Sequence, residues 1–319
     1  MALEFAQIDA ITERHFIPKL VDGVYNSKAF TARLARPEKL QLKDGGLEII
    51  APVINSKPGS GGYYDDLDTL STDRTDNLTA SKHSWRQLYE PIRVSRKEIL
   101  QNSGDAAKLS LVKSKVQIAE KQMKENMGLG LFSDGTGATG ALTTDQLDGL
   151  QAIVSDSSSY GGIAVADFAT WAAQVNENSG TDRALTLNLM QNVFGSASQD
   201  DDKPTVAVCK QNVYDQAWAL FQPHQRIMSE EMASLGFSNV LTFNGIPLIV
   251  DSHCLSQAMY FLNEDYVFLA VHKDENMRRE TIEKLESSNS MLMRIFWMGN
   301  IVCNNRRFQG VLKDIEVSS

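Results

Sequence analysis

The chain has 319 residues, of which 42% are hydrophobic and 22% are charged, and its formal net charge is −9 at pH 7. This composition is typical of a globular protein with one large or two modest domains, and it excludes a disordered, collagen-like or coiled-coil chain. The acidic balance argues against tight wrapping by nucleic acid, which needs clustered Lys and Arg. No apolar run approaches the ~20 residues of a membrane span and the first residues lack the pattern of an export signal, so we expect a soluble, unexported protein.

The first predicted element is an arm. Residues 16–34 place apolar side chains at near-helical spacing, but Pro18 and Gly23 interrupt the pattern early. We therefore expect residues 1–35 to form an arm with a weak amphipathic helix. Because such an arm has no core of its own, it gains order only by lying against another surface.

A projecting hairpin is predicted next. Residues 40–54 and 85–94 are rich in aliphatic and aromatic side chains, which favours two extended segments. Residues 55–79 between them include Tyr63, Tyr64 and five aspartates, and they are too polar to build a core. The pattern predicts a long hairpin that leaves the body, with residues 55–79 at its tip.

The clearest element is a helix over residues 105–132, where apolar residues recur three and four positions apart. They are Leu109, Val112, Val116, Ala119, Met123 and Met127. Breaker and capping residues precede the helix at 102–105, and Gly128 and Gly130 weaken its end. At about 1.5 Å per residue the helix is ~40 Å long, which suits a strut across a flat domain.

Beyond a glycine-rich connection at residues 135–140 the pattern becomes that of a mixed α/β body, which we interpret as a second domain. Helical patterns occur at residues 164–175 and 186–197. Apolar strands are expected at residues 205–209, 240–243, 246–250, 259–262 and 266–271. A charged stretch at 273–290 then leads to residues 291–302, whose large apolar side chains predict a central strand.

Catalytic and ligand-binding patterns are weak throughout the sequence. Residues 135–140 fit GxGxxG, but they follow a helix rather than a strand, which favours a flexible connection over a nucleotide site. Aspartates 200–202 and those of the hairpin tip lack the spacing of a calcium loop. The five histidines show no triad or metal spacing, and we expect buried reduced thiols at Cys209, Cys254 and Cys303. We therefore expect no catalytic residue, no cofactor and no metal.

The order of these elements resembles the phage major capsid proteins of the Hong Kong 97-like fold: an arm, a projecting hairpin, one strut helix, an α/β body and a returning apolar strand. The motifs most similar to the family are Phe16-Ile17-Pro18 with Phe30 and Leu34, residues 131–136, residues 149–154 with 160–163, Trp171, Gln225-Arg226, residues 235–237, residues 243–247 and Asp251. They cover nearly the whole chain, and their order carries the resemblance more than any single motif.

The resemblance implies a mixed α+β fold divided into the segments of that family. Residues 1–35 would be the N-terminal arm and residues 36–84 the E-loop, which is the family's projecting hairpin. Residues 85–140 would form the P-domain with its spine helix, and residues 141–272 the A-domain. Residues 273–319 would return to the P-domain sheet.

The function implied by the resemblance is that of a major capsid protein, which self-assembles through pentamers and hexamers into an icosahedral phage head enclosing double-stranded DNA. The partners would be further copies of the chain, a separate scaffolding protein, a portal, in some systems a decoration protein, and non-specifically packaged DNA, with no membrane. The location would be the virion, after assembly in the host cytoplasm. An arm and a coreless hairpin suit this function, because contacts repeated by rotation can order them across neighbouring subunits.

Residues expected to contact a neighbouring subunit are Phe16, Phe30, Lys57, Tyr63, Tyr64, Asp65, Asp66, Asp68, Arg306 and Arg307. Some family members cross-link their shells between an E-loop Lys and a P-domain Asn, assisted by a Glu. Lys57 and Asn289 are nominal partners here, but the position expected for Glu falls near Phe296. The transfer needs its acid or base in place, so interlocking contacts or a cementing protein are the expected stabilisers.

Two alternative functions stay open. An encapsulin-like compartment would have the same fold and enclose protein cargo, but the long arm and the long loop favour the phage interpretation. An intracellular α/β enzyme would need a convergent site, and the sequence offers no pattern for one.

Overall fold

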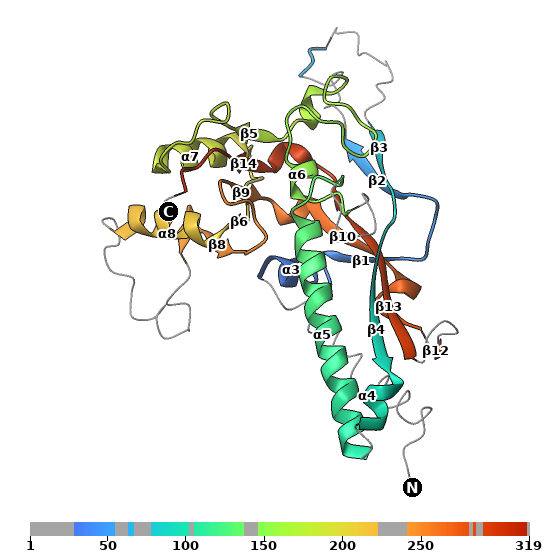
Figure 1. Cartoon of the computed structure of the whole chain (residues 1–319). Coiled ribbons are helices and arrows are strands. Elements are labelled where there is room, and N and C mark those ends of the chain that lie inside the picture. The colour runs from blue at the N-terminus through green and yellow to red at the C-terminus, as the bar shows by residue number, and fades with distance from the viewer. Residues whose placement is uncertain are drawn as a thin grey trace, which may run out of the picture.

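The computed structural model describes residues 29–54, 63–66, 78–101, 105–136, 146–222, 241–280, 283–284 and 290–317, and every structural statement below concerns these residues. Their strands form two six-stranded sheets and a two-stranded hairpin. A long helix, α5 (Asp105–Leu131), runs beside the first sheet, and shorter helices lie around the second (Figure 1). The mixed α+β fold class is the one that the sequence predicts. Among the described helices, α5 included, none is both long and apolar enough to span a membrane.

The first sheet is organised around β13 (Ser290–Cys303). Antiparallel to it run β4 (Arg86–Ser95), β10 (Val267–His272), β11 (Arg278–Arg279) and β12 (Glu283–Lys284), and β1 (Leu40–Lys43) extends the sheet in parallel with β10. The pairing of β13 with β4 continues from Ser290 opposite Ser95 to Gly299 opposite Arg86. The central strand predicted at residues 291–302 is therefore confirmed.

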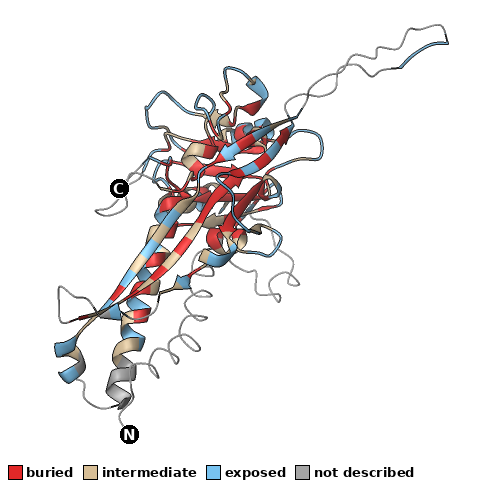
Figure 2. Ribbon diagram, turned by 90° about the vertical axis from the view of Figure 1, so that its right-hand side faces the viewer, coloured by how far each residue is buried: buried red, intermediate tan, exposed pale blue. Residues whose placement is uncertain are grey.

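Helix α5 covers one face of this sheet and matches the predicted strut within one residue. Its buried apolar side chains recur every three or four residues, at Val116, Ala119, Met123, Met127 and Leu131. At about 1.5 Å per residue, the 27 residues of α5 span ~40 Å. Figure 2 shows the buried residues concentrated where α5 and the sheets meet.

The second sheet has the strand order β5-β14-β9-β6-β8-β7. These strands are β5 (Gln174–Asn176), β6 (Val206–Cys209), β7 (Thr242–Phe243), β8 (Ile246–Val250), β9 (Met259–Leu262) and β14 (Gly310–Leu312). Val206 and Val208 face the core shared with α5, whereas Ala207 and Cys209 face a second core beneath α7 (Leu187–Ser196) and α8 (Gln211–Phe221). Because both faces are covered, β6 is apolar at every position.

The hairpin consists of β2 (Ile49–Ile54) and β3 (Leu78–His83), paired antiparallel with Ile49 opposite His83 and Ile54 opposite Leu78. The expectation that residues 85–94 form its second leg was wrong, because β4 occupies that segment and pairs with β13. The true second leg, Leu-Thr-Ala-Ser-Lys-His, carries few large apolar residues, so periodicity did not reveal it.

Residues 164–175 also differ from the expected helix. The structure has a 3-10 turn, η2 (Ala169–Trp171), followed by β5. Trp171 is 3% exposed and donates its indole N–H to the carbonyl of Tyr160 at 3.2 Å, so tertiary packing overrides a spacing that imitates a helix. The elements that were not predicted include α8 and β14. The remaining short elements are α3 (Ala29–Leu34), α4 (Arg96–Gln101), α6 (Leu150–Ile153), η4 (Glu264–Tyr266), η5 (Lys273–Glu275) and η6 (Arg306–Phe308).

Candidate subunit interfaces

The hairpin has one buried and one exposed face, as alternation along a strand requires. Ile49, Ala51 and Val53 of β2 point toward the body and are at most 5% exposed. On the other face, Ile50 and Ile54 are 59% and 76% exposed, and Leu78 opposite Ile54 is 71% exposed. A lone subunit therefore presents an apolar surface to water on the outward face of the hairpin. Such a surface is typical of a protein contact site.

The tip of the hairpin is described only at residues 63–66. Tyr63 and Tyr64 are fully and 70% exposed, and both aspartates that follow are exposed. The backbone N–H of Asp66 donates to the Asp65 carboxylate at 2.9 Å. Of the other expected contact residues, Phe16, Lys57 and Asp68 lie outside the described residues, as does Asn289 of the nominal cross-link. The four described tip residues lie in the part of the hairpin farthest from the body (Figure 2).

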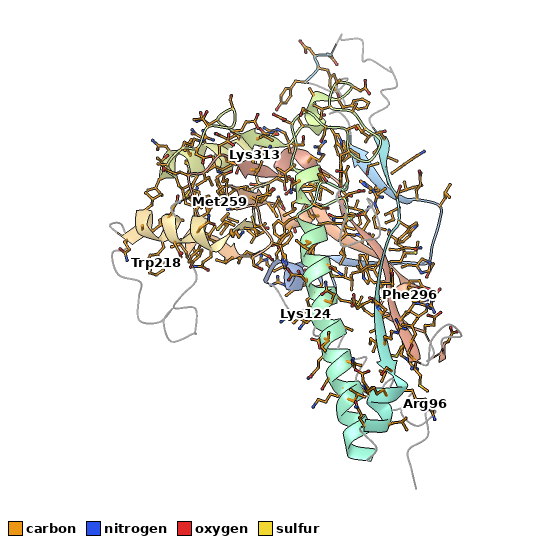
Figure 3. The ribbon with its side chains drawn as sticks, viewed as in Figure 1. Arg96, Lys124, Trp218, Met259, Phe296 and Lys313 are labelled. Atoms are coloured by element: carbon orange, nitrogen blue, oxygen red, sulfur yellow. The ribbon has the colours of Figure 1, made fainter. Side chains whose placement is uncertain are left out.

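A second surface lies on the first sheet, on the face opposite α5. Phe296 of β13 and Tyr89 of β4 are paired across the strands, with ring centroids 6.3 Å apart, and Tyr89 is 40% exposed. The guanidinium of Arg278 lies 5.1 Å from the Phe296 ring centroid, within the range of a cation–π contact. Figure 3 shows Phe296 on β13, distant from Trp218 at the far side of the molecule.

Two expected contact residues are instead buried within their own subunit. Phe30 of α3 is 1% exposed and packs against Phe132 with ring centroids 5.9 Å apart, so α3 belongs to the body rather than to a free arm. Arg306 is fully buried, so its side chain is inaccessible to a neighbour. Arg307 beside it is partly exposed and donates to the carbonyl of Ser196 at 2.5 Å.

Arg306 organises the chain after α6. Its guanidinium donates to the carbonyl oxygens of Ile153 and Ser155 at 2.6 Å each, and to that of Ser158 at 3.0 Å. It also lies 5.3 Å from the Tyr160 ring centroid. Burial lowers the pKa of Arg306, but the carbonyl oxygens provide a fixed polar environment for the cation.

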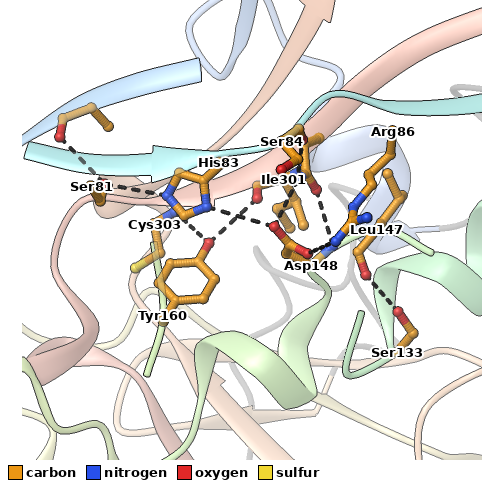
Figure 4. Close-up of polar contacts among 12 residues, drawn as sticks. Ser81, His83, Ser84, Arg86, Ser133, Leu147, Asp148, Tyr160, Ile301 and Cys303 are labelled. Atoms are coloured by element: carbon orange, nitrogen blue, oxygen red, sulfur yellow. Dashed lines mark hydrogen bonds and ion pairs between the residues drawn. The ribbon is translucent and has the colours of Figure 1, made fainter. Parts of the chain in front are cut away.

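A partly buried polar cluster joins the hairpin to the body (Figure 4). The Asp148 carboxylate accepts hydrogen bonds from Arg86 of β4 at 3.0 Å and from the side chain of Asn300 of β13 at 2.8 Å. Asn300 also donates to the carbonyl of Ser84 at 3.0 Å, between β3 and β4. His83, the final residue of β3, places its Nδ1 3.7 Å from the second oxygen of Asp148. The cluster thus connects the hairpin, both central strands and the segment before α6.

Asp148 is the anion of this cluster. Burial raises its pKa, but the contacts with His83, Arg86 and Asn300 outweigh burial, so the pKa lies below its ordinary value. Since residues 83, 148 and 300 are far apart in the sequence, no local pattern could have indicated that they meet.

The described residues offer little reactive chemistry. All three cysteines are buried and unpaired, in agreement with the sequence prediction. Burial raises the pKa of Cys209 and Cys303 to about 12. Within the described part of the chain, no three His, Cys, Asp or Glu side chains gather in a way that could hold a metal ion.

The fold is that of shell-forming capsid proteins. The capsid protein of cyanophage A-1(L) matches with a TM-score of 0.69 at 15% identity, over 90% of this chain and 93% of that chain. A chain of the satellite phage P4 procapsid, solved with its size determination protein, matches with a TM-score of 0.56 at 11% identity, over 95% of this chain and 91% of that chain. The SrpI encapsulin of Synechococcus elongatus matches with a TM-score of 0.52 at 10% identity, over 90% of each chain. No curated protein matches this chain in sequence.

The sequence itself identifies the family. The chain belongs to the SU10 major capsid protein family, whose sequence model matches residues 90–316. Its function is that of a major capsid protein, the structural subunit of an icosahedral phage capsid, and its place is the virion. The matched region contains α5 and both six-stranded sheets except β1 and the first residues of β4.

Proposed function

We propose that this chain forms the phage head through pentamers and hexamers, and that the outward face of its hairpin lies across a neighbouring subunit. The observation that carries the proposal is the exposure of Ile50, Ile54 and Leu78 on a hairpin face that no second layer of the described residues covers. A neighbouring copy would remove these side chains from water, and each fully buried Ile or Leu is worth ~1.5–3 kcal/mol. Tyr63, Tyr64, Asp65 and Asp66 at the tip would extend the same contact, and Arg307 and the sheet face around Phe296 are further candidate contacts.

In this proposal the family segments keep the boundaries expected from the sequence, with two changes suggested by packing. The E-loop proper is the hairpin of residues 49–83, because β1 belongs to the first sheet. The arm comprises residues before α3, because Phe30 and Leu34 pack in the body. The role is structural, without catalysis.

The head would enclose double-stranded DNA, and it would be built in the host cytoplasm with a separate scaffolding protein, a portal and, in some systems, a decoration protein. The net charge of −9 suits an inner wall that does not hold the genome tightly. Nuclease-protected DNA inside particles from infected cells would support this cargo, whereas particles holding only protein would favour the encapsulin-like alternative.

Assembly of the purified chain tests the interface. Expressed alone or with co-expressed scaffold, the wild-type chain should give shells, tubes or isolated rings by negative-stain electron microscopy and light scattering. A variant lacking residues 57–76 should remain folded by circular dichroism and yet give predominantly small species. Normal shells from that variant would exclude the hairpin tip as an assembly element.

A further inference from the structure

The hairpin root, which is the end of β3 next to the body, contacts the body through His83, whose side chain is 1% exposed. Its ring packs on Tyr160 with centroids 4.7 Å apart. The neighbouring Lys82 donates its backbone N–H to the carbonyl of Gly161 at 2.9 Å. Gly161 has a φ of +60°, and a Cβ there would lie 2.6 Å from the Cβ of Ser81, so glycine permits this close contact. The direction in which the hairpin leaves the body is therefore set at this point (Figure 4).

The two ring nitrogens of His83 face different groups. The Ser81 hydroxyl lies 3.2 Å from Nε2 and 3.3 Å from the carbonyl oxygen of Ala51, and it can donate to Nε2 or accept from it. Nδ1 faces Asp148, whose Oδ2 lies 3.7 Å from it, beyond the distance of a hydrogen bond. Nδ1 has no hydrogen-bond partner among the described residues.

Protonation of His83 makes both ring nitrogens donors and places a cation beside the Asp148 carboxylate. The titratable groups around the ring are Asp148 and Arg86 on one side and Tyr160, Cys303 and Arg306 on the other. Tyr160 and Cys303 stay neutral, since burial raises the pKa of both. Arg86 is paired with Asp148, and Arg306 lies beyond the Tyr160 ring, so the carboxylate is the charge nearest to Nδ1.

We propose that His83 and Asp148 form a pH-sensitive latch, in which protonation of His83 closes the contact between Nδ1 and Oδ2 and holds the hairpin against the body. One partner belongs to the hairpin. The other belongs to the segment before α6, which Asn300 ties to β13. The latch acts within one subunit and does not depend on the proposed assembly; in a shell, it would fix the hairpin direction before a neighbour covers the outward face.

Hydrogen exchange of the full chain, taken as unassembled subunits from size exclusion, tests the latch. Amides of residues 49–54 and 78–83 are followed by mass spectrometry at pH 5.5 and pH 7.5, with correction for intrinsic exchange. We expect exchange to be ~10-fold slower at pH 5.5, because opening of the hairpin then also breaks a charge-assisted contact. His83→Gln cannot be protonated and Asp148→Asn removes the anion, so both variants should lose the pH dependence.

The matched control is His253→Gln. His253 is also buried, but it contacts Glu125 of α5 and Asp251 rather than the hairpin, so this variant should keep the wild-type pH dependence of the hairpin amides. If the hairpin amides of the wild type exchange at the same corrected rate at pH 5.5 and pH 7.5, the latch is overturned, whatever the variants show. A pH dependence that persists in folded His83→Gln or Asp148→Asn overturns it as well.

Discussion

Arg306 connects segments that are distant in the sequence by satisfying carbonyl oxygens that α6 and the following turn leave free. It lies in η6 and reaches residues about 150 positions earlier, with its charge fully enclosed. A planar guanidinium can serve several acceptors at once, whereas an ammonium is a compact point charge. The sequence predicts Arg306 at a contact with a neighbouring subunit, because two adjacent arginines usually lie on a surface. Burial of only one of the two cannot be inferred without the fold.

Substitution of Arg306 therefore has a large expected cost. Arg306→Lys should lower the free energy of unfolding by about 3 kcal/mol, because buried carbonyl groups lose their partners and a cation stays enclosed. Urea denaturation of the unassembled subunit measures this change. Arg307→Lys is the matched control, since Arg307 is partly exposed and an altered surface contact usually changes stability by less than about 0.5 kcal/mol. Equal losses from the two substitutions would contradict the assigned role.

Gly128 offers a second test at the residue scale. Inside a helix, Gly→Ala normally stabilises by roughly 0.5–1 kcal/mol, but a Cβ at Gly128 of α5 would lie 2.4 Å from Nδ1 of His253. We expect Gly128→Ala to destabilise the subunit. Gly195→Ala in α7 should stabilise it, since a Cβ there meets nothing within 4 Å.

Thermal unfolding distinguishes these two outcomes. Combining Gly128→Ala with His253→Ala should cost less than the sum of the single changes, because the second substitution removes the clashing ring. Additive costs would show that the contact between α5 and His253 is not the cause.

At the scale of elements, the long periodic segments were predictable and the short ones were not. α5 and β13 each carry a pattern of more than ten residues, and α7 follows a capping residue, Thr186, whose hydroxyl accepts from the backbone N–H of Leu189. By contrast, β14 has three residues and β3 carries few large apolar side chains, so packing in the tertiary structure decides their conformation. Of the candidate interface, the exposed tip followed from composition. The cluster at the hairpin root did not, because its members meet only in the folded chain.

The two faces of the hairpin should respond differently to charge. Ile54→Asp places a carboxylate on the outward face, so the isolated subunit should keep its stability while the concentration needed for assembly rises about 10-fold or more, as expected for the loss of one buried aliphatic contact. Val53→Asp, one position earlier, buries the charge against the body and should destabilise the subunit itself.

Light scattering for assembly and circular dichroism for folding separate the two effects. The interface assignment fails if Ile54→Asp assembles as the wild type does, or if it unfolds as Val53→Asp is expected to do.

At the scale of the whole molecule, the two cores make the subunit sensitive to alkali. Burial raises the pKa of Cys209 and of Cys303 from the ordinary value of 9.0 to about 12. Between these values the unfolded chain loses a thiol proton that the folded chain keeps, so each thiol lowers stability by about 1.4 kcal/mol per pH unit as the pH rises. The stabilising effect is complete below pH ~9 and is lost toward pH ~12.

Urea denaturation at a series of pH values from 8 to 11 measures this slope. The double variant Cys209→Ala, Cys303→Ala should show a shallower decline than the wild type, whatever its stability at pH 8. The same slope in both proteins would mean that other groups cause the alkaline loss.

The position of β13 and β14 within their sheets governs when the subunit can fold. Both strands are synthesised after nearly all the others, yet β13 forms the centre of one sheet and β14 lies between β5 and β9 in the other. Neither sheet can close until residues 290–312 have left the ribosome, which adds only ~5–20 residues per second. Chains growing side by side on one messenger therefore hold unfinished sheets, and we expect the timing of translation to delay their association until residues 290–312 of each chain have emerged.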